Sequence, residues 1–286
     1  MTCSKTDEAP NLPEILWEKY DRLRQIITRA GDAAIGFSGG VDSTFLLKVC
    51  AEILGEPGEL GERLLAITIK SEVIPAKEVD SAHDIAETMG AKHIILKENV
   101  LEMPGFVQNH PDRCYICKKA IFSQIKKRAK FYGIRNCFDG GNIDDTADFR
   151  PGRVALNELG IRSPLAEAGF LKSDIRVVSE AIKLPTWDKP ALACLASRFP
   201  YYTEITKDAL KQVENAEAFL EKLGMHIFRV RHHGILARIE LGEREKKLLV
   251  KFDLCTKIVK HLKNLGYKYV SLDLEGYRTG SMNEVL

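Results

Sequence analysis

Residues 38–43 read SGGVDS and combine two adjacent glycines with two hydroxyl groups and one carboxylate. They follow an apolar run from Ala33 to Phe37 and precede an amphipathic segment from Thr44 to Leu54, so the pattern predicts a strand, a tight turn and a helix start. Glycines let successive backbone N–H groups point into such a turn, and the helix N-terminus adds positive potential. The turn therefore predicts a nest for phosphate oxygens. It differs from a Walker A loop, because no Gly-Lys-Ser or Gly-Lys-Thr follows the glycines.

Three of the seven cysteines have a spacing that suits metal or sulfur chemistry. Cys114 and Cys117 form a C-x2-C pair at the predicted start of a helix, where the helix dipole favours ionised thiols. Cys194 is a candidate third ligand from a distant part of the chain. The residues alone leave open a redox dithiol, a zinc site completed by Cys137 or His110, and an iron–sulfur cluster with one iron open to an exogenous sulfur atom.

Length and charge limit the class of protein. A chain of 286 residues is long enough for two domains. Its 42 basic and 40 acidic residues nearly cancel, so the chain lacks the strong positive charge expected of a protein whose main partner is nucleic acid. No apolar run approaches the roughly 20 residues that span a bilayer, and no early segment reads as a signal peptide. We therefore expect a cytoplasmic protein without membrane contact, in which disulfide bonds are disfavoured.

The order of predicted elements indicates an α/β fold. The elements are a helix at 12–30, strands at 33–37, 64–69 and 93–96, a helix at 77–89, and a strand that ends near 137–142. Such alternation is typical of a parallel, doubly wound sheet. Open sheets of this kind bind ligands at the carboxyl ends of their strands, where the loop at 38–43 would lie.

The pattern changes from about Tyr202. The elements predicted there are a helix at 208–223, a hairpin of strands at 227–231 and 235–241, a helix at 244–265 and a strand at 268–274. This order predicts a small α+β domain, so we expect one domain at 1–201 and a second at 202–286. Arg229 and Arg231 alternate along the first strand of the hairpin and share one face, where they could grip a phosphate or merely solvate an exposed strand.

Several runs of the chain resemble known enzymes. The loop at 38–43 resembles the SGGxDS loop of PP-loop ATP pyrophosphatases, which cleave ATP between the α and β phosphates and leave AMP on an oxygen of the substrate. Over nearly its whole length the chain resembles the LarE family of sulfur transferases. The further runs that carry this resemblance are DFRPG at 148–152, ACLASRFPY at 193–201, RVRHH at 229–233, ARIEL at 237–241 and LDLEGYR at 272–278.

The resemblance implies an enzyme that makes the organic part of the nickel-pincer nucleotide. Such an enzyme adenylylates a carboxylate of pyridinium-3,5-biscarboxylic acid mononucleotide, releases pyrophosphate and replaces an oxygen with sulfur. One branch of the family gives up the sulfur of its own cysteine and ends with dehydroalanine. A second branch holds a four-iron four-sulfur (4Fe-4S) cluster on three cysteines and uses external sulfide. Cys114 and Cys117, which the first branch lacks, make this chain resemble the second.

The resemblance also implies cofactors, partners and residue roles. The cofactors are ATP, Mg²⁺ and the cluster, and the partners are the mononucleotide, an external sulfide donor and further copies of the chain in a homo-oligomer. The catalytic residues are Asp42, Cys114, Cys117 and Cys194, and the last three hold the cluster. The ATP-binding residues are Ser38, Gly39, Gly40, Val41, Asp42, Ser43, Ile69 and Gly140. The residues that bind the substrate phosphate are Ser197, Arg198, Arg229 and Arg231, and the residues at the rim of the active site are Glu240 and Asp273.

Other functions remain alternatives at this point. The nearest is a PP-loop enzyme that thiolates tRNA with a three-cysteine cluster, although the chain carries neither a second C-x2-C pair nor a basic arm. A synthase of the GMP or NAD synthetase type would leave the three cysteines without a role. A nucleotide-binding regulatory protein would bind ATP at the loop without cleaving it.

Overall fold

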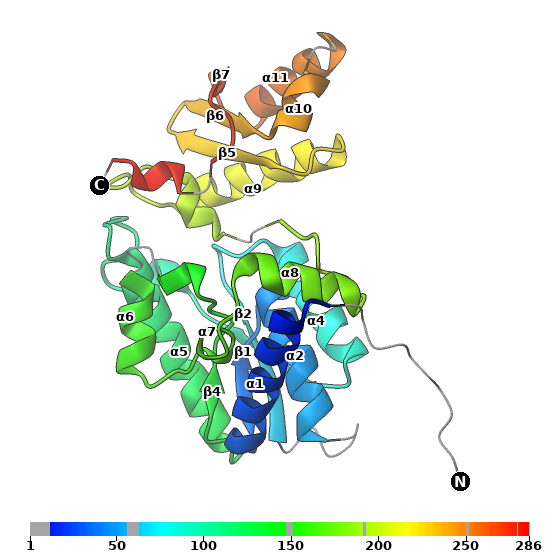
Figure 1. Ribbon diagram of the computed structural model, residues 1–286. Coiled ribbons are helices and arrows are strands. Elements are labelled where there is room, and N and C mark those ends of the chain that lie inside the picture. Colours follow the sequence, from blue (N-terminus) through cyan, green and yellow to red (C-terminus); the bar gives the residue numbers. More distant parts are fainter. Residues whose placement is uncertain are drawn as a thin grey trace. The chain divides into compact units, whose positions relative to one another are not determined.

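The computed structural model describes residues 12–55, 63–146, 151–190, 193–249, 252–278 and 280–285 (Figure 1). Residues 148–150 of the DFRPG run lie outside these ranges. The described chain forms two compact units, which we treat separately. The first contains the described residues up to Ile69, those of Lys77–Leu96 and those between Lys119 and Ala191. The second contains Lys70–Ala76, Lys97–Lys118 and the described residues from Cys194 onward, together with Ala193 at its edge.

The first unit is built on a four-stranded sheet with strand order β3-β2-β1-β4. Its strands are β1 (Ala33–Gly36), β2 (Leu64–Lys70), β3 (Lys92–Lys97) and β4 (Cys137–Phe138). The central strand β1 pairs in parallel with both β2 and β4, with Ile35 opposite Ala66 and Phe138. This confirms the predicted α/β fold. Because β1 is covered on both faces, its residues form a short apolar run without alternation.

Helices surround this sheet. They are α1 (Glu14–Ala30), α2 (Val41–Leu54), α4 (Ala76–Thr88), α5 (Arg113–Phe131), α6 (Pro151–Glu158), α7 (Pro164–Glu167) and α8 (Lys172–Ala181), with a 3-10 turn η2 at Asp144–Thr146. Helix α2 contacts α1, α8 and β1, and Phe45 of α2 meets Phe170 edge to face at 5.3 Å. Leu23 and Ile27 lie four residues apart on α1 and are fully buried against this core. The rigid core fixes the end of β1 and the start of α2, between which the loop at 38–43 lies.

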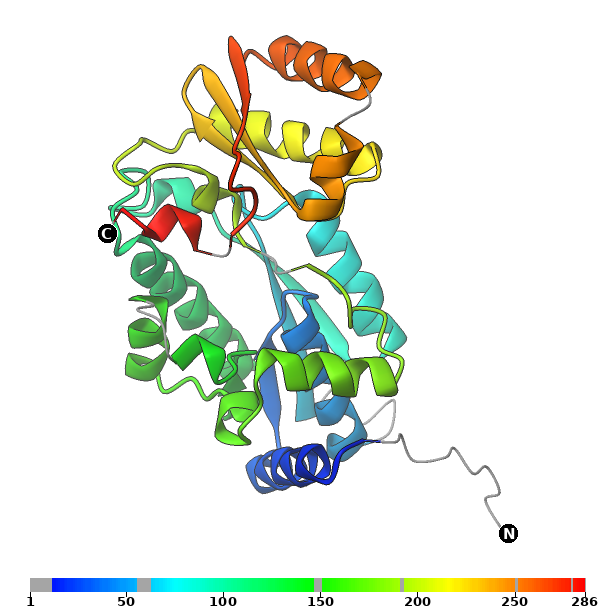
Figure 2. The ribbon, with the colours of Figure 1, turned by 45° about the horizontal axis from the view of Figure 1, so that its top comes forward.

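The second unit combines a three-stranded sheet with helices (Figure 2). Its elements are α9 (Lys207–Lys222), β5 (Phe228–His233), β6 (Leu236–Leu241), α10 (Glu243–Leu248), α11 (Phe252–Asn264) and β7 (Tyr269–Leu272), with 3-10 turns η1 (Val100–Glu102), η3 (Leu195–Arg198) and η4 (Ser281–Asn283). Strands β5 and β6 form the predicted antiparallel hairpin, with Val230 opposite Ile239, and β7 joins β6 in parallel. The single helix predicted at 244–265 is wrong, because the structure has two helices in this range.

Three segments that precede residue 202 pack with the second unit. They contribute to an apolar cluster that contains Val73, Phe106, Leu195 and Phe199 and also Leu210 of α9. By packing, the second unit is therefore larger than a division at residue 201 would make it, and that division stays a prediction about functional domains. One consequence is that Cys114, Cys117 and Cys194 belong to the same unit. In the described part of the chain, no helix has the length and apolar character to cross a membrane.

Candidate active-site residues

The loop of the first unit is shaped by Gly39 and closed by a serine. Gly39 has φ +67°, and a Cβ there would lie 3.0 Å from the Cα of Ala82, so the position suits glycine alone. The Ser43 hydroxyl accepts a hydrogen bond from the backbone N–H of Ser38 at 3.3 Å and lies 3.1 Å from the Ser38 hydroxyl. It also lies 3.3 Å from the Gly40 carbonyl oxygen. The predicted turn is thus closed at the start of α2.

The segments that contain Gly140 and Ile69 follow the two strands that pair with β1 or lie on them, as the sequence predicted. A Cβ on Gly140 would lie 3.1 Å from the Ser43 backbone nitrogen, so the segment after β4 passes directly beside the loop. Ile69 lies on β2, whose Ile67 accepts a hydrogen bond from the Phe37 N–H at 2.8 Å. The side chain of Val41, in contrast, is buried in the core, which leaves only its backbone for a ligand.

Two lysines that the sequence did not indicate approach this loop. The Lys172 ammonium lies 2.5 Å from Asp42 Oδ2. The Lys189 ammonium donates to the Gly39 carbonyl oxygen at 3.1 Å and pairs with Glu78 at 2.8 Å. Positive charge is therefore supplied by residues far along the chain, where a Walker A loop would carry its own lysine. Sequence spacing contains no signal for such distant contacts.

Asp42 is an acidic group in a mixed environment. Burial raises the pKa of its carboxyl above the ordinary value, the Lys172 ammonium opposes this shift, and Asp145 adds to it. Asn142 also lies beside Asp42. Carboxylate and amide oxygens are the ligands that Mg²⁺ prefers, so this neighbourhood has the donor types for that ion.

The three candidate cysteines lie in one neighbourhood of the second unit. Cys114 and Cys117 occupy the first two turns of α5, and Cys194 precedes the turn η3. Cys117 and Cys194 are half-buried against the same apolar cluster, whereas Cys114 is exposed. Burial raises the pKa of Cys117 to about 12, and the thiols of Cys194 and Cys114 contribute to that shift. The structure thus brings together the helix-start pair and the distant third thiol.

The described residues show no metal site, so neither a zinc site nor the predicted 4Fe-4S site is shown by the structure. Among them, no group of three His, Cys, Asp or Glu side chains is placed to hold one metal ion. Of the two proposed fourth ligands, Cys137 is buried on β4 of the first unit, and the His110 ring packs edge-on against Tyr202 at 5.2 Å.

Arg113 is a further residue that the sequence interpretation missed. It immediately precedes Cys114, and its guanidinium hydrogen-bonds to the Asn109 side chain and, at 3.1 Å, to the Ala196 carbonyl oxygen. Burial alone would lower the pKa of Arg113, but the thiols of Cys194 and Cys114 raise it above its ordinary value. The guanidinium is therefore a buried positive charge against two of the three cysteines. The only signal in the sequence is the arginine directly before the C-x2-C pair, and its burial is known from the structure.

Three arginines gather at the turn that carries Cys194. Arg198 donates to the Cys194 carbonyl oxygen at 3.2 Å and pairs with Glu217 at 2.9 Å. Arg231 donates to the Ser197 carbonyl oxygen at 3.0 Å. Burial and the nearby charges of Arg198 and Arg231 lower the pKa of Arg229, whose guanidinium also lies 5.1 Å from the centre of the Tyr277 ring. The structure thus brings Ser197, Arg198, Arg229 and Arg231 together, and their role in binding a phosphate stays a prediction.

The two acidic residues expected at the rim differ in their surroundings. Glu240 is fully buried and bonds Arg231 at 2.6 Å and Arg238 at 3.1 Å. Asp273 is half-buried and lies 3.5 Å from Arg238. In this structure the Glu240 carboxylate is occupied by two arginines. A direct contact of Glu240 with substrate stays a prediction.

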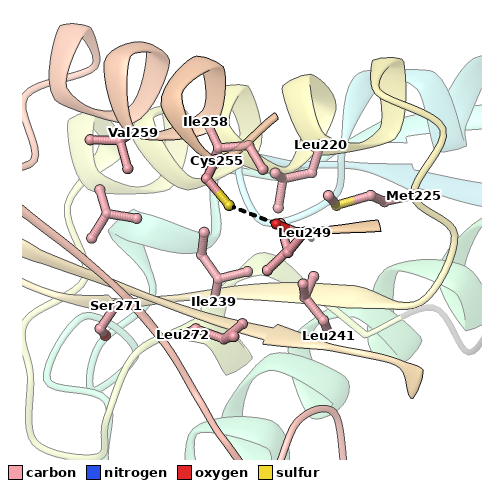
Figure 3. A pocket seen from close by; sticks show the side chains of 11 residues that line it. Leu220, Met225, Ile239, Leu241, Leu249, Cys255, Ile258, Val259, Ser271 and Leu272 are labelled. Carbon is pink, nitrogen blue, oxygen red and sulfur yellow. Dashed lines mark hydrogen bonds between the residues drawn. The ribbon is translucent and has the colours of Figure 1, made fainter. Parts of the chain in front are cut away.

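An apolar cavity of about 130 Å³ lies elsewhere in the second unit (Figure 3). Its walls come from β6, β7 and α11, and Cys255 directs its sulfur to the Leu249 carbonyl oxygen at 3.2 Å. None of the predicted site residues lines this cavity. The candidate residues are therefore the loop of the first unit and, taken separately, the cysteines and arginines of the second unit, and the cavity is not among them.

Comparison with known proteins identifies the family. The NAD synthase family description matches residues 16–131, which include the loop. An uncharacterized protein of Synechocystis sp. is 39% identical over 272 residues, covering 95% of this chain and 99% of the relative. The pyridinium-3,5-bisthiocarboxylic acid mononucleotide synthase of Lactiplantibacillus plantarum is 37% identical over 252 residues, covering 88% of this chain and 89% of the relative. At this identity and coverage, the chain belongs to the LarE family of ATP-using PP-loop enzymes.

Proposed function

We propose that this chain is an ATP-dependent sulfur transferase acting on pyridinium-3,5-biscarboxylic acid mononucleotide, in the biosynthesis of the nickel-pincer nucleotide. The observation that carries the proposal is the turn at 194–198. Its cysteine shares a neighbourhood with Cys114 and Cys117, and its backbone carbonyls accept hydrogen bonds from Arg198 and Arg231. A sulfur-bearing turn held by cations suits an anionic substrate that receives sulfur. The similarity to the synthase of Lactiplantibacillus plantarum supports the same substrate class.

The first half-reaction activates a carboxylate at the loop. A carboxylate oxygen attacks the α-phosphorus of ATP, the bond between this phosphorus and the α–β bridging oxygen breaks, and pyrophosphate leaves with the bonding electrons. The loop N–H groups and the Ser38 and Ser43 hydroxyls bind phosphate oxygens, and Lys172 and Lys189 add positive charge. Asp42 would hold Mg²⁺, which neutralises the leaving pyrophosphate when bound.

The second half-reaction replaces the activated oxygen with sulfur. Sulfide attacks the acyl carbon, and the carbon–oxygen bond to AMP breaks, so AMP leaves with the electron pair. Arg198, Arg229 and Arg231 bind the phosphate of the mononucleotide and hold its acyl group near the turn at 194–198. A 4Fe-4S cluster on Cys114, Cys117 and Cys194 would supply an open iron for external sulfide, so that no cysteine is consumed.

A cluster and a single metal ion make different demands on the spacing of three thiols. A zinc site needs sulfurs about 3.8 Å apart, from bonds of about 2.3 Å in tetrahedral geometry. A cubane binds each cysteine on a different iron and so accepts thiols that are further apart. Cys114 and Cys194 both act on the pKa of Cys117, and this shared neighbourhood is the observation on which the proposed cluster rests.

The test is a pyrophosphate-release assay on anaerobically prepared enzyme. We expect release that depends on ATP and the pyridinium mononucleotide, and iron and acid-labile sulfide that disappear in Cys114→Ala, Cys117→Ala and Cys194→Ala. Cys255→Ala, which changes a thiol of the second unit outside the site, is the matched control and should retain both. Release that requires tRNA would instead assign the chain to tRNA thiolation. Pyrophosphate release without the mononucleotide and without tRNA, or no pyrophosphate release at all, would reject the assignment as a sulfur transferase.

A further inference from the structure

Asn109 and Arg113 form a buried hydrogen-bonded pair between the two segments that carry the cysteines. Asn109 is fully buried, and Arg113 is 5% exposed. The Asn109 amide donates to the Pro200 carbonyl oxygen at 2.7 Å, while its side-chain oxygen accepts from Arg113. The same Arg113 nitrogen donates to the Ala196 carbonyl oxygen at 3.1 Å. The pair thus binds the backbone on both sides of Ser197 to the start of α5.

Backbone contacts extend this connection. The Tyr202 N–H donates to the Asn109 carbonyl oxygen at 3.1 Å, and the Leu195 N–H donates to the Val73 carbonyl oxygen at 2.8 Å. Asn109 has φ +56°, a left-handed conformation that asparagine tolerates better than most residues. This conformation is part of the turn that leads the chain into α5. The contacts fix the helix start and the 194–202 segment as one body.

The partners of Arg113 are unusual for a buried arginine. In the described part of the chain, no carboxylate forms an ion pair with it, although an uncompensated buried charge is costly. Its second terminal nitrogen lies 3.9 Å from the Cys114 sulfur instead. Arg113 is therefore directed at carbonyl oxygens and sulfur, which is an arrangement for positioning those groups.

We propose that Arg113, oriented by Asn109, is a positioning residue that holds the turn carrying Cys194 at the helix start carrying Cys114 and Cys117, so that the three thiols stay within reach of one another before any metal binds. The inference deepens the proposed function, on which its catalytic consequence rests. The planar guanidinium is needed because it donates in several fixed directions at once. A lysine ammonium keeps the charge but cannot reproduce that fork.

Thiol crosslinking in the iron-free, reduced full-length chain tests this proposal. A short bismaleimide is added, and peptide mass spectrometry measures the rates of the Cys117–Cys194 and Cys114–Cys117 crosslinks. We expect Arg113→Gln and Arg113→Lys to slow the Cys117–Cys194 crosslink about fivefold or more, the effect of losing one or more hydrogen bonds. Because Arg113 also contacts the Cys114 sulfur, each crosslink rate is divided by the rate at which N-ethylmaleimide alkylates the same thiols. The Cys114–Cys117 crosslink lies within one helix and should keep this normalised rate, which provides an internal control.

A second variant distinguishes loss of the proposed contact from misfolding of Arg113→Gln. Asn109→Gly permits the positive φ and removes only the amide, so it should reproduce the slower crosslink and add little to Arg113→Gln in the double variant. Arg128→Gln, on the same helix but away from the cysteines, is the matched control. A wild-type Cys117–Cys194 rate in Arg113→Gln and Asn109→Gly, or full rescue by Arg113→Lys, would overturn the proposal. Because no ATP or substrate is present, the result is independent of whether the proposed reaction occurs.

Discussion

The Lys172 ammonium lies 2.5 Å from a carboxylate oxygen of Asp42, although 130 positions separate the two residues. The side chains are 30% and 22% exposed, so the pair is partly shielded from water. Asp42 is the acidic group of the phosphate loop, and Lys172 begins α8. The loop therefore has a cation beside its acidic group, and this cation opposes the effect of burial on the pKa of Asp42.

Lys172→Met should make the unfolding free energy more dependent on pH. An acid whose pKa is raised on folding costs stability as the pH rises through its ordinary value of 3.8, because the unfolded chain releases the proton first. Without Lys172 this cost grows, so the variant should lose about 1 to 3 kcal/mol at pH 7 and little near pH 3. Denaturant unfolding across this range measures the difference.

Lys19→Met is the control, because it breaks a similarly buried pair with Asp174 and should leave ATP binding intact, whereas Lys172→Met should weaken ATP binding. A pH-independent difference would contradict the role given to Lys172.

Gly39→Ala should abolish ATP binding, whereas Gly31→Ala should not. Both glycines have positive φ, +67° and +74°, so each alanine costs about 1 to 2 kcal/mol of backbone strain. At Gly31 a Cβ meets no atom within 4 Å, but at Gly39 it meets Ala82 at 3.0 Å and must displace the loop. Equilibrium binding of ATP and thermal unfolding separate the two effects. Equal ATP affinity in the two variants would argue against the loop as the phosphate site.

Arg229→Ala and Arg231→Ala should differ in their effect on unfolding stability, although both residues are proposed to bind the substrate phosphate. Arg231 pairs with the fully buried Glu240, which keeps Arg238 as a second partner, so removal of Arg231 should cost about 1 to 3 kcal/mol of stability, the range for a lost hydrogen bond to a charged group. The Arg229 guanidinium lies 5.1 Å from the centre of the Tyr277 ring, and its loss should weaken mononucleotide binding by about 1 to 3 kcal/mol with a smaller effect on stability. Calorimetric binding of the mononucleotide and of ATP, with thermal unfolding, provides the measurement. Unchanged mononucleotide affinity in Arg229→Ala would remove that residue from the site.

His93 should make the protein less stable in acid. Burial, and then the neighbouring His83, lower the pKa of His93 to about 4 from its ordinary 6.5. Between these values the unfolded chain binds the proton and the folded chain does not, so this contribution is present above pH 6.5 and is lost as the pH falls toward 4. His93→Gln should flatten the pH dependence of unfolding in this window, and His110→Gln is the control for loss of a histidine elsewhere. An unchanged slope in His93→Gln would show that His93 is protonated in the folded protein.

Local features of the site could be predicted from the sequence. The loop at 38–43 follows β1 and begins α2 as expected, because the glycines, the apolar run and the helical spacing are adjacent in the chain. The C-x2-C pair lies at the start of α5 for the same reason. The alternation of Arg229 and Arg231 likewise follows from the period of a strand.

Partners that are distant in sequence could not be predicted. Lys172 reaches Asp42 through the tertiary fold, and this contact leaves no periodic trace in the chain. The packing of the segment at 97–118 with the second unit depends on buried residues such as Phe106, which pack with Leu195 and Leu210. Composition identifies such residues as apolar but does not say which core they join.

The central claim is that the chain uses ATP to place external sulfide on its substrate without consuming Cys194. Intact-mass analysis of the protein, after incubation with ATP, Mg²⁺, the pyridinium mononucleotide and sulfide under anaerobic conditions, tests it most directly when product is quantified in the same samples. We predict several thiocarboxylate products and several pyrophosphates for each chain, with the Cys194 peptide unchanged in mass. One product for each chain, with a loss of about 34 Da that marks dehydroalanine at Cys194, would contradict the account.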